Sequence, residues 1–125
     1  SRLERPTRAY GSRLIVSEST RAGHDGLIYR EIDRVRVKGK HVPVAIYEPL
    51  AYRDLAAPKL LRELELYNEA LRRYRDGDWD AALARFAALK DDNPQQPLYS
   101  LYIERIRHLL LVPPVGEWLG VFEHQ

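Results

Sequence analysis

A change in the spacing of apolar residues near the middle of the chain sets the strongest limit on its fold. Between residues 27 and 48 apolar and charged residues alternate, a spacing of two that is typical of strands with one buried face. After residue 58 the spacing becomes about 3.6, which places the apolar residues on one side of a helix. These residues are Leu60, Leu64, Tyr67, Leu71 and Tyr74. The sequence therefore predicts an α+β protein in which strands precede helices.

Residues 27–37 and 42–48 are predicted to form a β-hairpin. Both runs are rich in Ile, Val or Tyr, and residues 38–40, which read Lys-Gly-Lys, supply the glycine that favours a tight turn. The alternation slips once near Arg34, which predicts a β-bulge there. Pro43 indicates that the second strand is an edge strand or begins at about that residue.

The residues before this hairpin predict shorter elements. Residues 1–9 are expected to be the end of a helix that Tyr10-Gly11 closes, and residues 13–17 form a short apolar run typical of a buried strand. A brief helical turn is expected next, capped by Ser19-Thr20 and ended near Gly23.

The stretch from Pro49 to Pro58 is interpreted as a linker between two parts that differ in kind. We assign residues 1–50 to the first domain, residues 51–58 to the linker proper and residues 59–125 to a helical tail.

The helical tail is predicted to contain three helices. Gly77 is expected to end the first helix, Asp78 to cap the second and Pro97 to lie in the first turn of the third. Aromatic residues of the second helix and of the C-terminal stretch are expected to be buried against these helices. They are Trp79, Phe86, Trp118 and Phe122.

Composition excludes several classes of protein. The chain has 125 residues and contains no Cys, so a disulfide scaffold, a thiolate zinc site and a thiol nucleophile are excluded. No run of about 18 apolar residues occurs, so no membrane span is predicted. The chain contains no Met and begins with Ser1, and we therefore expect it to be a piece of a longer parent protein.

Basic charge is concentrated in the first third. Residues 1–40 hold 10 Lys and Arg against 5 Asp and Glu, a net charge of +5, whereas the remaining residues carry a net charge of −3. This imbalance favours an anionic partner such as a nucleotide, a nucleic acid or an acidic lipid. A solvated arginine-rich face is the simpler interpretation on charge alone.

The hairpin carries the motif with the most specific resemblance. Residues 30–40 read R-E-I-D-R-V-R-V-K-G-K, and residues 43–48 contain P-V and then I-Y-E. This stretch resembles the last hairpin of class III adenylate and guanylate cyclase catalytic domains. Upstream segments at residues 1–4, 10–11 and 15–18 resemble the preceding helix and strand of that family. The resemblance covers residues 1 to about 50 and implies the closing portion of a ferredoxin-like cyclase domain.

The resemblance also implies two site residues. In the family an arginine supports the charge of the transferring phosphate, and the first lysine of V-K-G-K holds the triphosphate; these positions are Arg2 and Lys38 here. Cyclisation builds negative charge on phosphate oxygens, so fixed cations aimed at them lower the barrier. Lys40 is interpreted as a solvated charge, and Arg34 and Arg36 as surface or dimer-interface charges.

The metal site of the family is not matched in this chain. The family binds two magnesium (or manganese) ions through two aspartates in the first half of the domain, and the residues that recognise adenine also lie there. Asp25 and Asp33 match no metal-ligand pattern, and the four His residues show no ligand spacing. The resemblance therefore implies that this chain alone is inactive, whereas the parent would convert ATP to cyclic AMP and pyrophosphate as a homodimer in the cytoplasm.

The second part of the chain resembles one tetratricopeptide repeat. The resemblance is carried by small and aromatic residues at characteristic positions, although the usual Leu-Gly pair of the first helix is absent. The matching residues are Ala70, Tyr74, Gly77-Asp78-Trp79, Ala82, Phe86 and Pro94. Bacterial cyclases with an extracytoplasmic sensor and an inner-membrane anchor often end in such a tail. A plain helical hairpin is the alternative.

Two other functions stay open. The first is a non-catalytic interaction protein whose helical tail binds another protein. The second is a nucleic-acid binder that uses the basic first third. It ranks last, because only Tyr10 and Tyr29 could stack on bases there, and we therefore expect no nucleic-acid partner.

Overall fold

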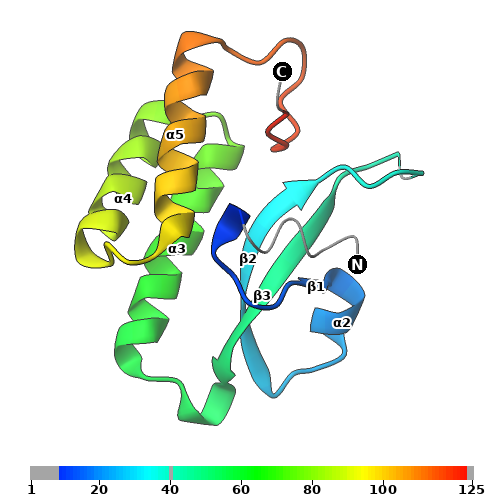
Figure 1. The fold of residues 1–125 in the computed structure, drawn as a ribbon, viewed down its shortest axis with the longest axis vertical. Helices are drawn as coiled ribbons and strands as arrows, with labels where there is room; N and C mark the ends of the chain where they lie inside the picture. Colours follow the sequence, from blue (N-terminus) through cyan, green and yellow to red (C-terminus); the bar gives the residue numbers. More distant parts are fainter. Residues whose placement is uncertain (1–8, 40, 124–125) are drawn as a thin grey trace. The chain divides into compact units, whose positions relative to one another are not determined.

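The computed structural model describes residues 9–39 and 41–123 and has the expected α+β class (Figure 1). The chain divides into two compact units. The sheet unit comprises the chain up to Pro58 together with the residues from Val121 onward, and the helical unit runs from Lys59 to Gly120.

The sheet unit contains three antiparallel strands, β1 (Val16–Ser17), β2 (Leu27–Val35) and β3 (Val44–Tyr52). Their order is β1-β3-β2, so the predicted hairpin of β2 and β3 is confirmed (Figure 1). The alternative of an edge strand after Pro43 is wrong, because β3 lies in the centre and Pro43 precedes its first residue.

Strand β3 is longer than the alternation predicts. It continues to Tyr52 and therefore includes Pro49, where the sequence suggests a linker. The register against β2 shifts between Ile28 and Tyr29, and Tyr29 lies opposite Pro49. A proline is tolerated at such an irregularity because its missing N–H breaks no regular ladder bond. A 3₁₀ turn (Arg53–Leu55) follows the strand within the predicted linker.

The β-bulge of β2 lies between Glu31 and Asp33, slightly before the position that the alternation predicts. The extra residue changes the phase of the strand. Ile32 and Asp33 are adjacent, yet both are buried, with 0% and 2% of their surfaces exposed. Strict alternation from Ile32 would place Asp33 on the opposite, charged face of the strand, and the structure shows that this placement is wrong.

The buried polar groups of β2 have specific partners. The Tyr10 hydroxyl donates to Asp33 Oδ2 at 2.5 Å, and the Arg34 backbone N–H donates to Asp33 Oδ1 at 2.8 Å. Arg30 lies opposite Glu48 in the ladder, and the Arg30 Nε to Glu48 Oε1 distance is 3.6 Å. These contacts satisfy charge that would be costly to bury without a partner.

We expect Tyr10→Phe to lower the free energy of unfolding by about 1.5–3 kcal/mol, because it removes a buried hydrogen bond to a charged carboxylate. Tyr52→Phe is the matched control, since Tyr52 is 66% exposed. Urea denaturation followed by circular dichroism measures both variants. Equal midpoints for the two variants would contradict a stabilising role for the Tyr10–Asp33 contact.

The strand predicted at residues 13–17 is shorter than expected, and the helix end predicted at residues 1–9 lies almost entirely outside the described residues. Strand β1 spans two residues, and the short helix α2 (Glu18–Ala22) follows it directly. The cap of α2 is Ser17, whose hydroxyl accepts a hydrogen bond from the Thr20 backbone N–H, so the prediction of a cap at Ser19-Thr20 is wrong. The turn after α2 contains Gly23, as predicted.

The helical unit contains the three predicted helices, α3 (Pro58–Arg75), α4 (Trp79–Asp92) and α5 (Pro97–Leu111), shown side by side in Figure 1. Gly77 has a φ of +78°, which explains why glycine ends α3. Gln96 caps α5 by accepting a hydrogen bond from the Leu98 N–H at 3.2 Å.

Aromatic side chains form the core of the helical unit. Phe86 stacks on Tyr102 with ring centroids 4.8 Å apart, and Tyr102 meets Tyr74 edge-on at 4.9 Å. The fully buried rings are Tyr67, Tyr74, Phe86, Tyr99 and Tyr102. Such contacts add to the hydrophobic contribution of each ring.

Two residues near the start of α4 differ from expectation. Asp78 occupies the N-cap position, but its side chain makes no capping hydrogen bond and instead lies 3.4 Å from Arg73. Trp79 is only partly buried, and its ring meets the rings of Tyr74 and Trp118 at 5.8 Å and 5.2 Å. Trp79 is the first residue of α4.

The C-terminal stretch is fixed at Trp118. The indole N–H of Trp118 donates to the Tyr74 carbonyl at 3.1 Å, and the two rings meet edge-on at 5.5 Å. The prediction that Trp118 packs on the helices is therefore confirmed. Phe122, which was expected to do the same, belongs to the sheet unit.

Candidate functional site

The predicted phosphate-binding lysine lies on the loop that connects β2 and β3. The ladder between these strands ends at the pair Val35 and Val44, and residues 36–39 and 41–43 lie outside both strands. Gly39 has a φ of +86°, a conformation that residues with a Cβ rarely adopt. Lys38, immediately before it, is exposed. Glycine is thus required for the turn that presents Lys38 to solvent.

The electrostatics around this loop favour an anion. From Arg34 to Tyr47 the sequence contains four Lys or Arg residues and no Asp or Glu. Arg36, two residues before Lys38, forms an ion pair with Glu123, with 2.6 Å between Nε and Oε1. A lysine ammonium is a compact point charge that suits a phosphate oxygen. A lysine at this position is a candidate phosphate ligand.

The second predicted site residue is not placed by the structure. Arg2 lies outside the described residues, as does Lys40. The structure thus gives the local setting of Lys38 alone.

Residues 9–39 and 41–123 contain no cluster of His, Asp or Glu side chains that could hold a metal ion. Within the same residues, no helix has the length and apolar character needed to cross a membrane.

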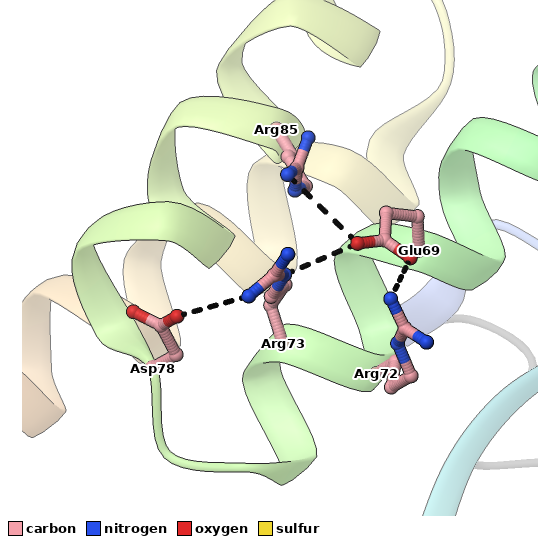
Figure 2. Close-up of polar contacts among 5 residues, drawn as sticks. All are labelled: Glu69, Arg72, Arg73, Asp78 and Arg85. Atoms are coloured by element: carbon pink, nitrogen blue, oxygen red, sulfur yellow. Dashed lines mark hydrogen bonds and ion pairs between the residues drawn. The ribbon is translucent and has the colours of Figure 1, made fainter.

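A second charged cluster joins α3 to α4 and was not predicted (Figure 2). Glu69 accepts hydrogen bonds from Arg72 and from Arg73, the latter at 3.1 Å, and Arg85 of α4 lies 3.8 Å away. The hydrogen bond from Arg72, followed by the one from Arg73, lowers the pKa of Glu69. The spacing of Glu69 from the two arginines was the available sequence signal, because residues three and four apart meet on a helix.

The three arginines of this cluster, drawn in Figure 2, pair with two carboxylates of the chain itself. Arg73 lies between Glu69 and Asp78, so its charge is shared between two acids. We interpret the cluster as a stabilising contact between α3 and α4 rather than as a ligand site.

A third polar group lies between α2 and β3. The Tyr47 hydroxyl donates to the carboxylate of Glu18, which also pairs with Arg21. The Arg21 guanidinium lies 4.8 Å from the centre of the Tyr47 ring. Burial, followed by the hydrogen bond to Glu18, raises the pKa of Tyr47 to about 12, and that hydrogen bond also lowers the pKa of Glu18.

We expect Tyr47 to ionise near pH 12, later than the ordinary value of 10. Because its pKa is raised in the folded state, Tyr47 contributes stability that is present below about pH 10 and is lost as the pH rises toward 12. NMR of ¹³C-labelled tyrosine rings resolves this titration among the eight tyrosines. Glu18→Gln should lower the Tyr47 pKa, and a Tyr47 that titrates near 10 in the wild-type chain would argue against this contact.

Comparisons with known proteins assign no family to the chain. No protein-family model matches it, and searches of curated proteins and of solved structures found no match.

Proposed function

We propose that this chain is the closing part of a class III nucleotide cyclase and that Lys38 binds the triphosphate of ATP in the parent protein. The observation that carries this proposal is the position of Lys38. It lies exposed in a hairpin loop, beside a glycine with positive φ, in a sequence segment (Arg34 to Tyr47) that contains four basic residues and no Asp or Glu. The parent would form cyclic AMP and pyrophosphate in the cytoplasm.

The chemistry assigns different roles to the two cations. The ribose 3′-hydroxyl releases its proton to water and its oxygen attacks the α-phosphorus of ATP. The bond from that phosphorus to the bridging oxygen breaks, and pyrophosphate leaves with the electron pair. The Lys38 ammonium would bind the polyphosphate as a point charge, whereas Arg2 would act where charge grows in the transition state. Magnesium or manganese, held elsewhere in the parent, would supply Lewis-acid stabilisation.

The phosphate contact can be tested on the chain itself with inorganic tripolyphosphate. We expect the amide signals of Lys38 and Gly39 to shift in an NMR titration, and we expect Lys38→Ala to weaken the binding by about tenfold or more. Lys59→Ala is the matched control, because Lys59 is an exposed lysine in the helical unit. Equal affinity of the two variants would overturn the proposed role of Lys38.

We expect the purified 125-residue chain to make no cyclic nucleotide from ATP with magnesium or manganese. The reason is that no residue of the chain matches the metal-binding aspartates of the family, and the described residues hold no cluster suited to a metal ion. Chromatographic detection of cyclic AMP measures this directly. Formation of cyclic AMP above a protein-free blank would contradict the prediction that the metal-binding aspartates lie outside this chain.

A protein-binding role for the helices is the second candidate. It is favoured by a groove between α3 and α4 that contains the exposed apolar residue Leu66, with charged residues on its rim. The groove is lined by Lys59, Arg62, Glu63, Leu66, Leu89, Asp92 and Asn93. Crosslinking from residue 66 would identify a protein that binds in this groove. Leu66→Asp should abolish that binding, whereas binding of tripolyphosphate should stay unchanged.

A further inference from the structure

The loop that carries Lys38 connects β2 to β3 beyond the end of their ladder. Backbone pairing between these strands ends at Val35 and Val44, so the described loop residues, 36–39 and 41–43, lie outside it. Gly39 adds conformational freedom rather than rigidity. A side-chain contact with another segment can restrain the position of such a loop.

Arg36 makes such a contact. Its Nε donates to Glu123 Oε1 at 2.6 Å, which joins the loop to a residue 87 positions later in the chain. Among the described residues of the loop, Arg36 makes the only side-chain ion pair. The two side chains are 49% and 58% exposed, so the pair is modest in strength and can be broken without disturbing a core.

The residues next to Glu123 are packed within the sheet unit. Val121 and Phe122 belong to the same unit as Arg36, and both are partly buried. Gly120, which precedes them, is buried and has a φ of +80°, so the backbone turns at a defined point just before this segment. Because this segment is packed, its ion pair with Arg36 can restrain the loop. A segment without packing contacts could not do so.

We propose that Glu123 is a positioning residue for Lys38. It binds Arg36 and thereby restrains the loop, so that Lys38 is presented to a polyphosphate in a narrower range of positions. This inference rests on the proposed function of Lys38. It makes the C-terminal residues of the chain a determinant of phosphate affinity, although Glu123 carries the same sign of charge as the ligand.

The first test measures the loop itself by amide hydrogen exchange. We expect Glu123→Arg and Arg36→Glu each to increase exchange at residues 37–39 about two- to fivefold, and the double reversal to restore slow exchange. Glu117→Arg is the matched control, because Glu117 is an exposed glutamate of the same C-terminal stretch. Unchanged exchange in both single variants would overturn the inference.

The second test separates positioning from simple charge. Glu123→Arg and Glu117→Arg raise the net charge equally, so electrostatics alone would strengthen tripolyphosphate binding in both. Positioning instead predicts that Glu123→Arg weakens binding about two- to fivefold, relative to Glu117→Arg, and that the double reversal recovers the affinity. Affinities that rise equally in both variants would overturn the inference.

Failure of the proposed function gives a different result. In that case Lys38→Ala would leave tripolyphosphate binding unchanged, whatever the exchange rates of the loop. If Lys38→Ala weakens binding but Glu123→Arg behaves like Glu117→Arg, then Lys38 binds phosphate and Glu123 does not position it.

Discussion

Replacing Lys38 by alanine in a longer protein that also contains the upstream half of a cyclase domain should lower turnover or ATP affinity about ten- to a hundredfold. The variant removes one charge-assisted contact to phosphate, which contributes about 1.5–3 kcal/mol. The fold should be unaffected, because Lys38 is exposed in a loop outside both strands. Steady-state kinetics measures the effect, and circular dichroism verifies folding.

Two further variants make this result specific. Lys40→Ala should have much less effect, because the resemblance assigns the triphosphate contact to the first lysine of the motif only. Arg2→Ala should lower kcat more than it raises KM, since its partner charge grows only in the transition state. If Lys38→Ala and Lys40→Ala both stay near wild type, the loop is a solvated turn and nothing more.

Phe86→Ala should lower the free energy of unfolding of the helical unit by about 3–5 kcal/mol. Phe86 has 0% of its surface exposed, stacks on Tyr102 at 4.8 Å and meets Tyr67 edge-on at 6.1 Å. Removing the ring leaves a cavity between α4 and its neighbours that rigid aromatic residues cannot easily fill. Chemical denaturation followed by circular dichroism and tryptophan fluorescence measures the loss.

Trp79→Ala is the informative comparison for Phe86→Ala. From the sequence alone, burial of Trp79 would predict a loss of about 3–5 kcal/mol. Because the structure leaves Trp79 partly exposed at the start of α4, we now expect a clearly smaller loss than for Phe86→Ala. A larger loss for Trp79→Ala than for Phe86→Ala would show that the core of this unit is centred elsewhere.

The elements whose signals are local could be predicted from the sequence. The hairpin of β2 and β3 follows from alternation around a glycine, and the boundaries of α3–α5 follow from Gly77 and Pro97. These signals act within a few residues, through the φ values that glycine and proline allow or impose. For the same reason, the sequence was sufficient to predict that Lys38 lies in an exposed loop.

The bulge shows the limit of local sequence signals. A slip in the alternation marks its approximate place, but which side chains it turns inward depends on the partner strand and on what covers the sheet. The alternation therefore predicts Asp33 to be a surface residue, whereas in the structure it is a buried acceptor for Tyr10. The central position of β3 likewise depends on its pairing with β1, which neither strand specifies alone.

The order of strands and helices, the glycine turn and the basic stretch that carries Lys38 all follow from the amino-acid sequence, because each depends on neighbouring residues. The pairing of Glu123 with Arg36 and the hydrogen bond from Trp118 to Tyr74 became evident only in the folded chain. Both contacts join residues far apart in the sequence, and periodicity carries no information about such pairs. They form because folding brings side chains that are distant in the sequence within hydrogen-bonding distance of one another.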